Sequence, residues 1–112
     1  MAEKKKIFSY MIPEKNIQWE TGENDKVYLL KEKSKNKIMK KLIEIFNKNQ
    51  YFKIHFDEIG TFVWKNIDGK NSIKDLGRIL REWDQEIDFP QPEERVEKFI
   101  LMLLKNKFIK VE

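Results

Sequence analysis

The sequence predicts an α+β fold, in which a small antiparallel sheet precedes a group of helices. Stretches of alternating apolar and polar residues are confined to the first half of the chain, and apolar residues at helical spacing dominate the second half. Capping and turn-forming residues separate these segments. Segregated strands and helices are typical of α+β proteins. The length of 112 residues fits one domain with a small core.

The first half of the chain is expected to form three strands and one short helix. Residues 17–20 and 26–31 flank the turn-forming segment 21–25, which predicts a β-hairpin. Residues 51–56 alternate again and predict a third strand. One face of this strand would carry Phe52, Ile54 and Phe56, and the other Tyr51, Lys53 and His55. Between the hairpin and the third strand, apolar residues predict a short amphipathic helix: Ile38, Met39, Leu42, Ile43 and Phe46.

The second half is expected to form three helices. Asp57 suits the N-cap of the first helix, and Asn71 or Ser72 that of the second, where Ser72 with Asp75 has a spacing like that of a capping box. Gly77 within the second helix costs helix stability unless it lets another helix approach closely. Pro92 suits the first turn of the third helix. Residues 108–111 are expected to form a short terminal strand.

Together these elements predict a winged-helix-like arrangement, with a three-stranded antiparallel sheet followed by a three-helix bundle. Residues 1–13 are expected to be a flexible lead-in, and residues 14–112 a single domain. The longest apolar run, residues 99–104, is far shorter than the roughly 20 residues of a membrane span. We therefore expect a cytoplasmic protein that has no membrane partner.

The composition argues against a catalytic function. The absence of Cys excludes disulfide scaffolds, thiolate metal sites and cysteine nucleophiles. His55 is the only histidine, the serines lie in tail, connector and cap positions, and the glycines lack the spacing of a phosphate loop. The carboxylates of residues 84–88 lack the glycine and the distal Glu of a calcium loop. The sequence therefore predicts no enzyme, no cofactor and no metal site.

Three binding functions remain open. A winged helix can read DNA with its third helix, although Glu93, Glu94 and Glu97 oppose the approach of phosphate there. The basic segment 31–48, with 7 Lys and 2 Glu, can bind nucleic acid or an acidic peptide. Its amphipathic helix leaves a dimerising interaction module open, through Ile38, Met39, Leu42 and Phe46, so the protein is expected to be a monomer or a homodimer. An exposed third strand can instead accept an extended peptide as a further strand.

Residues 56–64 (Phe-Asp-Glu-Ile-Gly-Thr-Phe-Val-Trp), 67–69 (Ile-Asp-Gly) and 72–76 form an ordered set of short motifs. Together with Trp19-Glu20 and the segment 99–109, they resemble the PqqD-like family, named for coenzyme PQQ synthesis protein D. The resemblance covers roughly residues 12–111 and implies a winged-helix-like fold. It also implies peptide recognition, because such domains bind the leader of a ribosomally made precursor peptide and present it to a modifying enzyme, often a radical SAM protein.

The resemblance also implies a site. The leader would pair with the third strand and lie against the third helix. These positions are Phe52, Lys53, Ile54 and His55 on the strand, and Val96, Phe99, Ile100 and Leu103 on the helix. From charge alone, Arg95 and Lys98 are expected to pair with acidic leader residues. Replacing Ile54 with Pro is expected to abolish binding, because it removes a backbone donor and disturbs the strand.

Two features depart from the family pattern. Residues 31–50 are inserted between the second and third strands, in a layout that a longer subgroup shares. Lys107 stands where the family often has Gly before the last aromatic residue. Asn106 is therefore expected to supply the left-handed turn that ends the third helix.

Overall fold

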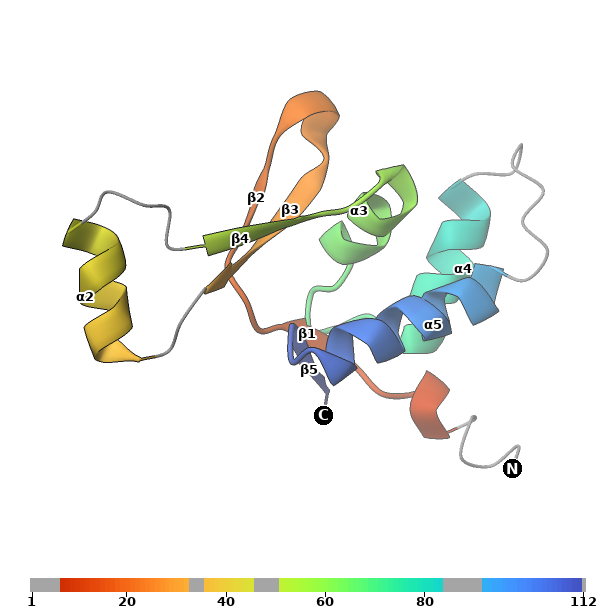
Figure 1. Cartoon of the computed structure of the whole chain (residues 1–112). Helices are drawn as coiled ribbons and strands as arrows, with labels where there is room; N and C mark the ends of the chain where they lie inside the picture. The colour runs from red at the N-terminus through yellow and green to blue at the C-terminus, as the bar shows by residue number, and fades with distance from the viewer. Residues whose placement is uncertain (1–6, 33–35, 46–50, 84–91, 112) are drawn as a thin grey trace. The chain divides into compact units, whose positions relative to one another are not determined.

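The computed structural model describes residues 7–32, 36–45, 51–83 and 92–111 (Figure 1). The chain divides into two compact units, which are described separately below. We call residues 17–58 the sheet unit, and residues 1–16 with 59–112 the helical unit. The predicted α+β class, with a three-stranded antiparallel sheet followed by helices, is confirmed. The predicted boundary at residue 13 stays a prediction.

The sheet unit contains three antiparallel strands in the order β2-β3-β4 (Figure 1). In chain order its elements are β2 (Trp19–Thr21), the 3-10 turn η1 (Glu23–Asp25), β3 (Val27–Glu32), α2 (Lys37–Ile45) and β4 (Tyr51–His55). The predicted hairpin is confirmed, since Trp19 pairs with Leu29 across β2 and β3. Val27 and Leu29 on the central strand are fully buried.

The short helix predicted between the second and third strands forms as α2. Its described apolar side chains are exposed, Ile38 by 72% and Ile45 by 66%. Phe46 lies outside the described residues, and so do the side chains of Leu42 and Ile43.

The helical unit holds the other elements (Figure 1). These are β1 (Pro13–Lys15), α3 (Glu58–Lys65, whose first residue belongs to the sheet unit), α4 (Ile73–Trp83), α5 (Pro92–Lys105) and β5 (Ile109–Val111). β5 confirms the predicted terminal strand, and it pairs with β1, which the sequence analysis missed. Met11, within the predicted lead-in, accepts a backbone hydrogen bond from Ile73 at 2.9 Å.

Apolar stripes of the helices form the core of the helical unit. Its fully buried side chains include Trp64, Ile67, Ile73, Leu76, Leu80, Val96, Ile100 and Leu103. The rings of Phe62 and Trp83 stack at 4.1 Å between centroids. α5 does approach Gly77 closely, because a Cβ atom built there would lie 2.9 Å from the Glu93 side chain. Gly77 therefore allows α4 and α5 to pack closely.

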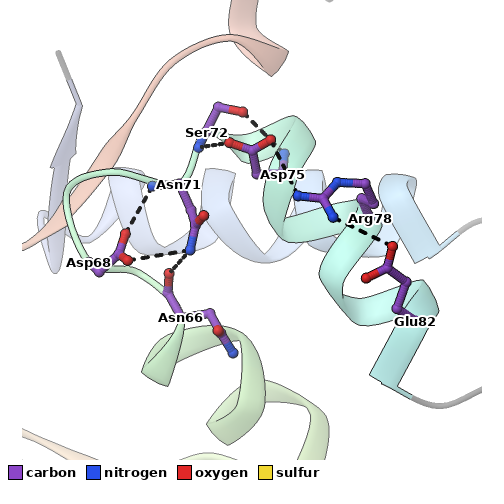
Figure 2. A network of polar contacts seen from close by, with 7 residues as sticks. All are labelled: Asn66, Asp68, Asn71, Ser72, Asp75, Arg78 and Glu82. Atoms are coloured by element: carbon purple, nitrogen blue, oxygen red, sulfur yellow. Dashed lines mark hydrogen bonds and ion pairs between the residues drawn. The ribbon is translucent and has the colours of Figure 1, made fainter.

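A network of polar contacts lies at the start of α4 (Figure 2). Ser72 Oγ accepts a hydrogen bond from Asp75 N–H at 3.1 Å, and Asp75 Oδ2 accepts one from Ser72 N–H at 2.9 Å. These two bonds confirm the predicted capping box. Just before it, the Asp68 carboxylate accepts hydrogen bonds from the backbone N–H groups of Lys70 and Asn71, both at 2.9 Å. Backbone hydrogen bonds lower the pKa of both Asp68 and Asp75.

The end of α5 corrects one prediction. The left-handed residue is Lys107, with φ 62°, and not Asn106. The N–H of Phe108 donates to Leu103 O at 2.9 Å and the N–H of Lys107 donates to Leu104 O at 3.0 Å, which is the Schellman pattern. Asn106 instead donates a hydrogen bond from its side-chain amide to Met102 O, one turn back in α5, at 2.8 Å. A lysine thus occupies the position that usually favours glycine.

Candidate functional site

The outer edge of β4 is the first half of the candidate site. Among the strands that the structure describes, β4 pairs only with β3. Phe56 N–H donates to Val27 O at 2.9 Å, and the same register places Ile54 opposite Leu29. Since hydrogen-bonded and non-hydrogen-bonded pairs alternate, the backbone groups of Ile54 face β3. Those of Lys53 and His55 therefore point to the outer edge.

The two faces of β4 differ in chemistry, as the alternation of residues 51–56 predicts. Phe52 and Ile54 share the face of Leu29; Phe52 is 56% exposed and Ile54 is half-buried. Lys53 and His55 are exposed on the opposite face. An extended peptide beside this edge would meet apolar side chains on one face and basic or polar ones on the other.

Tyr28 organises the polar face of the sheet unit. Its hydroxyl donates to Glu20 Oε2 at 2.6 Å, and this bond raises the pKa of the Tyr28 phenol. Lys53 Nζ lies 5.2 Å from the centroid of the Tyr28 ring, within the range of a cation–π contact. The His55 ring lies 5.4 Å from the same ring, tilted by 41°. Tyr28 thus contacts both polar side chains of β4 that the resemblance assigns to the site.

A hollow of about 390 Å³ lies beside Tyr28, at the hairpin end of the sheet unit. It is lined by Gly22, Glu23, Asn24, Lys26, Tyr28, His55 and Phe56. Asn24 and Asp25 adopt positive φ values of 56° and 60°, which shape the loop. From the sequence this loop was predictable only as a turn, because the hollow also needs His55 at the end of the distant β4 and Phe56 just after it.

The second half of the predicted site lies on α5, in the helical unit. Val96, Ile100 and Leu103 are exposed by 1% or less and belong to the core. Phe99 is half-buried. The assignment of these residues to a peptide surface stays a prediction, and the three core residues offer a partner no surface in this conformation.

Other side chains of α5 are more accessible. Arg95 and Lys98 are exposed, and Lys98 Nζ lies 3.6 Å from Glu94 Oε1 in an ion pair one turn away. Leu101 is 54% exposed and Met102 38% exposed. Leu101 and Met102 were not among the predicted site residues. The unbroken apolar run 99–104 was the available signal, because one buried stripe cannot use every residue of such a run.

Within the part of the chain that the structure describes, no group of three or more His, Asp or Glu side chains is placed to hold a metal ion. No helix in the described ranges is long and apolar enough to cross a membrane. The cytoplasmic location stays a prediction.

Comparison with known proteins identifies the family. Searches of curated proteins and of solved structures returned no match. A family model described as coenzyme PQQ synthesis protein D (PqqD) matches residues 29–109. The matched region begins in β3, ends in β5 and includes β4 and the three helices α3, α4 and α5. Because this match spans most of the chain, the protein belongs to the PqqD family.

Proposed function

We propose that this protein is a non-catalytic peptide chaperone or adaptor. It captures the leader of a ribosomally made precursor peptide by strand addition at β4 and presents it to a modifying enzyme, such as a radical SAM protein. Membership in the PqqD family suggests a part in the biosynthesis of coenzyme PQQ or other modified peptides, as a peptide-binding partner. The observation that carries the proposal is the edge position of β4, with the backbone groups of Lys53 and His55 pointing outward.

Backbone pairing alone gives limited affinity. Lys53 and His55 offer two donors and two acceptors, and each hydrogen bond contributes a net of about 1 kcal/mol. Four such bonds supply about half of the 8 kcal/mol that corresponds to micromolar binding. Side-chain contacts must add the rest, and Phe52 and Ile54 lie on the face that can supply apolar contacts. Strand addition therefore sets the register, and the side chains beside it set the specificity.

The register also identifies the informative substitution. Ile54→Pro, which the sequence analysis favoured, would remove an N–H that faces β3, so it would damage the sheet itself. Lys53→Pro removes only an N–H that points to the outer edge, where proline is tolerated. Lys53→Ala is the matched control, because it shortens the same side chain and keeps the backbone donor.

Candidate leaders are the peptides encoded by small open reading frames beside the gene. Amide NMR titration and calorimetry should show that one of them shifts the β4 amides and binds the Lys53→Pro variant about tenfold more weakly, with a much smaller loss for Lys53→Ala. A folded Lys53→Pro variant that binds the leader as tightly as the unaltered protein would contradict strand addition at this edge. The absence of a response to every candidate leader would count against leader capture.

A dimerising module is the second candidate, and α2 favours it. Ile38 and Ile45 on this helix are exposed by 72% and 66%. Exposed apolar side chains on a short helix are typical of an interaction surface. Sedimentation of the full chain over a range of concentrations tests this candidate, which a monomer at the highest concentration would exclude.

A further inference from the structure

We infer that the sheet face bearing Lys53 and His55 selects carboxylate side chains at alternate positions of the peptide segment that adds to β4. This inference rests on the proposed function and names the class of peptide that the site takes. The selected segment alternates acidic residues with apolar ones.

The positions follow from strand geometry. A segment paired to the outer edge of β4 places one residue directly opposite Lys53 and another directly opposite His55, two positions apart. The Cβ atoms of directly opposite residues lie about 4.5–5.5 Å apart and share one face of the sheet. Two alternate side chains of the bound segment therefore stand beside the ammonium of Lys53 and the imidazole of His55.

The charge nearest to these positions favours a carboxylate. Lys53 lies on β4, directly beside the added segment, whereas Glu32 and Glu20 lie on β3 and β2, one and two strands farther away, and Glu20 accepts the Tyr28 hydroxyl at 2.6 Å. Lys53 Nζ rests 5.2 Å from the Tyr28 ring centroid. Such a contact at an exposed site is weak, and the lysine stem is flexible, so the ammonium can turn toward a carboxylate on the added strand.

The hollow beside His55 extends the same surface. Lys26 and Glu23 both line it, and the Asn24 amide adds a hydrogen-bonding group. Its volume of about 390 Å³ has room for an acidic side chain that stands opposite His55. Lys26 can then contribute a cation to that carboxylate.

The apolar face of β4 determines which kind of residue lies between the two acidic positions of the bound segment. A bound residue opposite Ile54 would contact Phe52, which is 56% exposed, and the half-buried Ile54 itself. Apolar side chains gain most there, because they remove this apolar surface from water. The expected motif is therefore acidic, apolar, acidic, read along the added strand.

The test uses the full chain and an mRNA-displayed library of random peptides as the probe. We expect the enriched peptides to carry acidic residues at two positions that flank an apolar one, and to shift the Lys53 and His55 amides. In the Lys53→Glu variant, the preference at one of these positions should change from acidic to basic, while the other stays acidic. Lys37→Glu, with the same charge change on α2, should leave the preference unaltered.

Binding measurements on single peptides from the selection give the contribution of each acidic residue to affinity. Replacing one selected acidic residue by its amide should weaken binding about two- to fivefold at low salt, and added NaCl should reduce this difference. Enriched peptides that shift the β4 amides but show no acidic preference would overturn this inference and leave the proposed function standing. If no enriched peptide shifts the β4 amides, strand addition at β4 fails, and the inference fails with it.

Discussion

The contact between α4 and α5 at Gly77 allows a quantitative test of the packing. A Cβ atom at Gly77 would lie 2.9 Å from Glu93 Cγ and 3.1 Å from Glu93 Cα. The side chain of Glu93 cannot easily move aside, because it forms two hydrogen bonds with Arg81, at 2.9 Å to Nε and 2.8 Å to Nη2. The Cα atom can retreat only if the backbone of α5 moves. Gly77→Ala should therefore strain the interface between the helices.

Two opposing effects decide the sign of this substitution. Alanine in place of glycine favours a helix interior by about 0.8–1.0 kcal/mol. Overpacking a tight contact typically costs about 1–3 kcal/mol. Since one of the close atoms belongs to the α5 backbone, we take the middle of this range and expect Gly77→Ala to lower the free energy of unfolding by about 1 kcal/mol.

Urea unfolding followed by circular dichroism measures this loss. A peptide of residues 73–83 serves as the control, because the same substitution should raise its helicity once α5 is absent. In a double-mutant cycle, Glu93→Ala should reduce the cost of Gly77→Ala by removing the closest contact. An intact Gly77→Ala protein that is more stable than the unaltered chain would refute the argument that the two helices are in tight contact here.

Two further predictions concern the helix ends. Lys107→Gly should raise the free energy of unfolding by about 0.5–1 kcal/mol. Glycine adopts the left-handed conformation at φ 62° without strain, but it also makes the unfolded chain more flexible, which offsets part of this gain. Thermal unfolding checks this, with Asn106→Gly as a control that should destabilise. Asp68 and Asp75 have lowered pKa values in the folded state. The stability that these two carboxylates contribute should therefore be complete above their unfolded-state pKa of about 3.9 and disappear as the pH falls through their folded-state pKa values. The free energy of unfolding of the Asp68→Asn/Asp75→Asn variant, measured as the pH is lowered, should lack this part of the pH dependence. An unchanged dependence on pH would contradict this prediction.

The local elements of the fold could be predicted because their signals lie within a few residues of each other. The capping box of Ser72 and Asp75 spans one helical turn, and the alternation of residues 51–56 identifies β4 and its two faces. The hairpin also follows from local turn chemistry at residues 21–25. Each of these elements needs information only from its own segment.

The candidate site was less predictable. The family resemblance placed Val96, Ile100 and Leu103 at a peptide surface, and it could not tell that all three are buried in the core. Leu101 remains exposed although it is equally apolar. A buried and an exposed leucine look alike in a sequence when both lie in one apolar run, because burial depends on the neighbours that the fold brings to each face.

The sequence by itself determined the α+β class, the capping box that begins α4, the alternation of β4 and the absence of cysteine chemistry. Only the tertiary structure decided that β1 pairs with β5 from the opposite end of the chain, since a three-residue strand carries too weak a local signal. It also placed the left-handed turn at Lys107, where the Schellman hydrogen bonds fix the end of α5. The outward direction of the Lys53 and His55 backbone groups follows from the register with β3. Register is a relation between distant segments, and it becomes definite only when the sheet has formed.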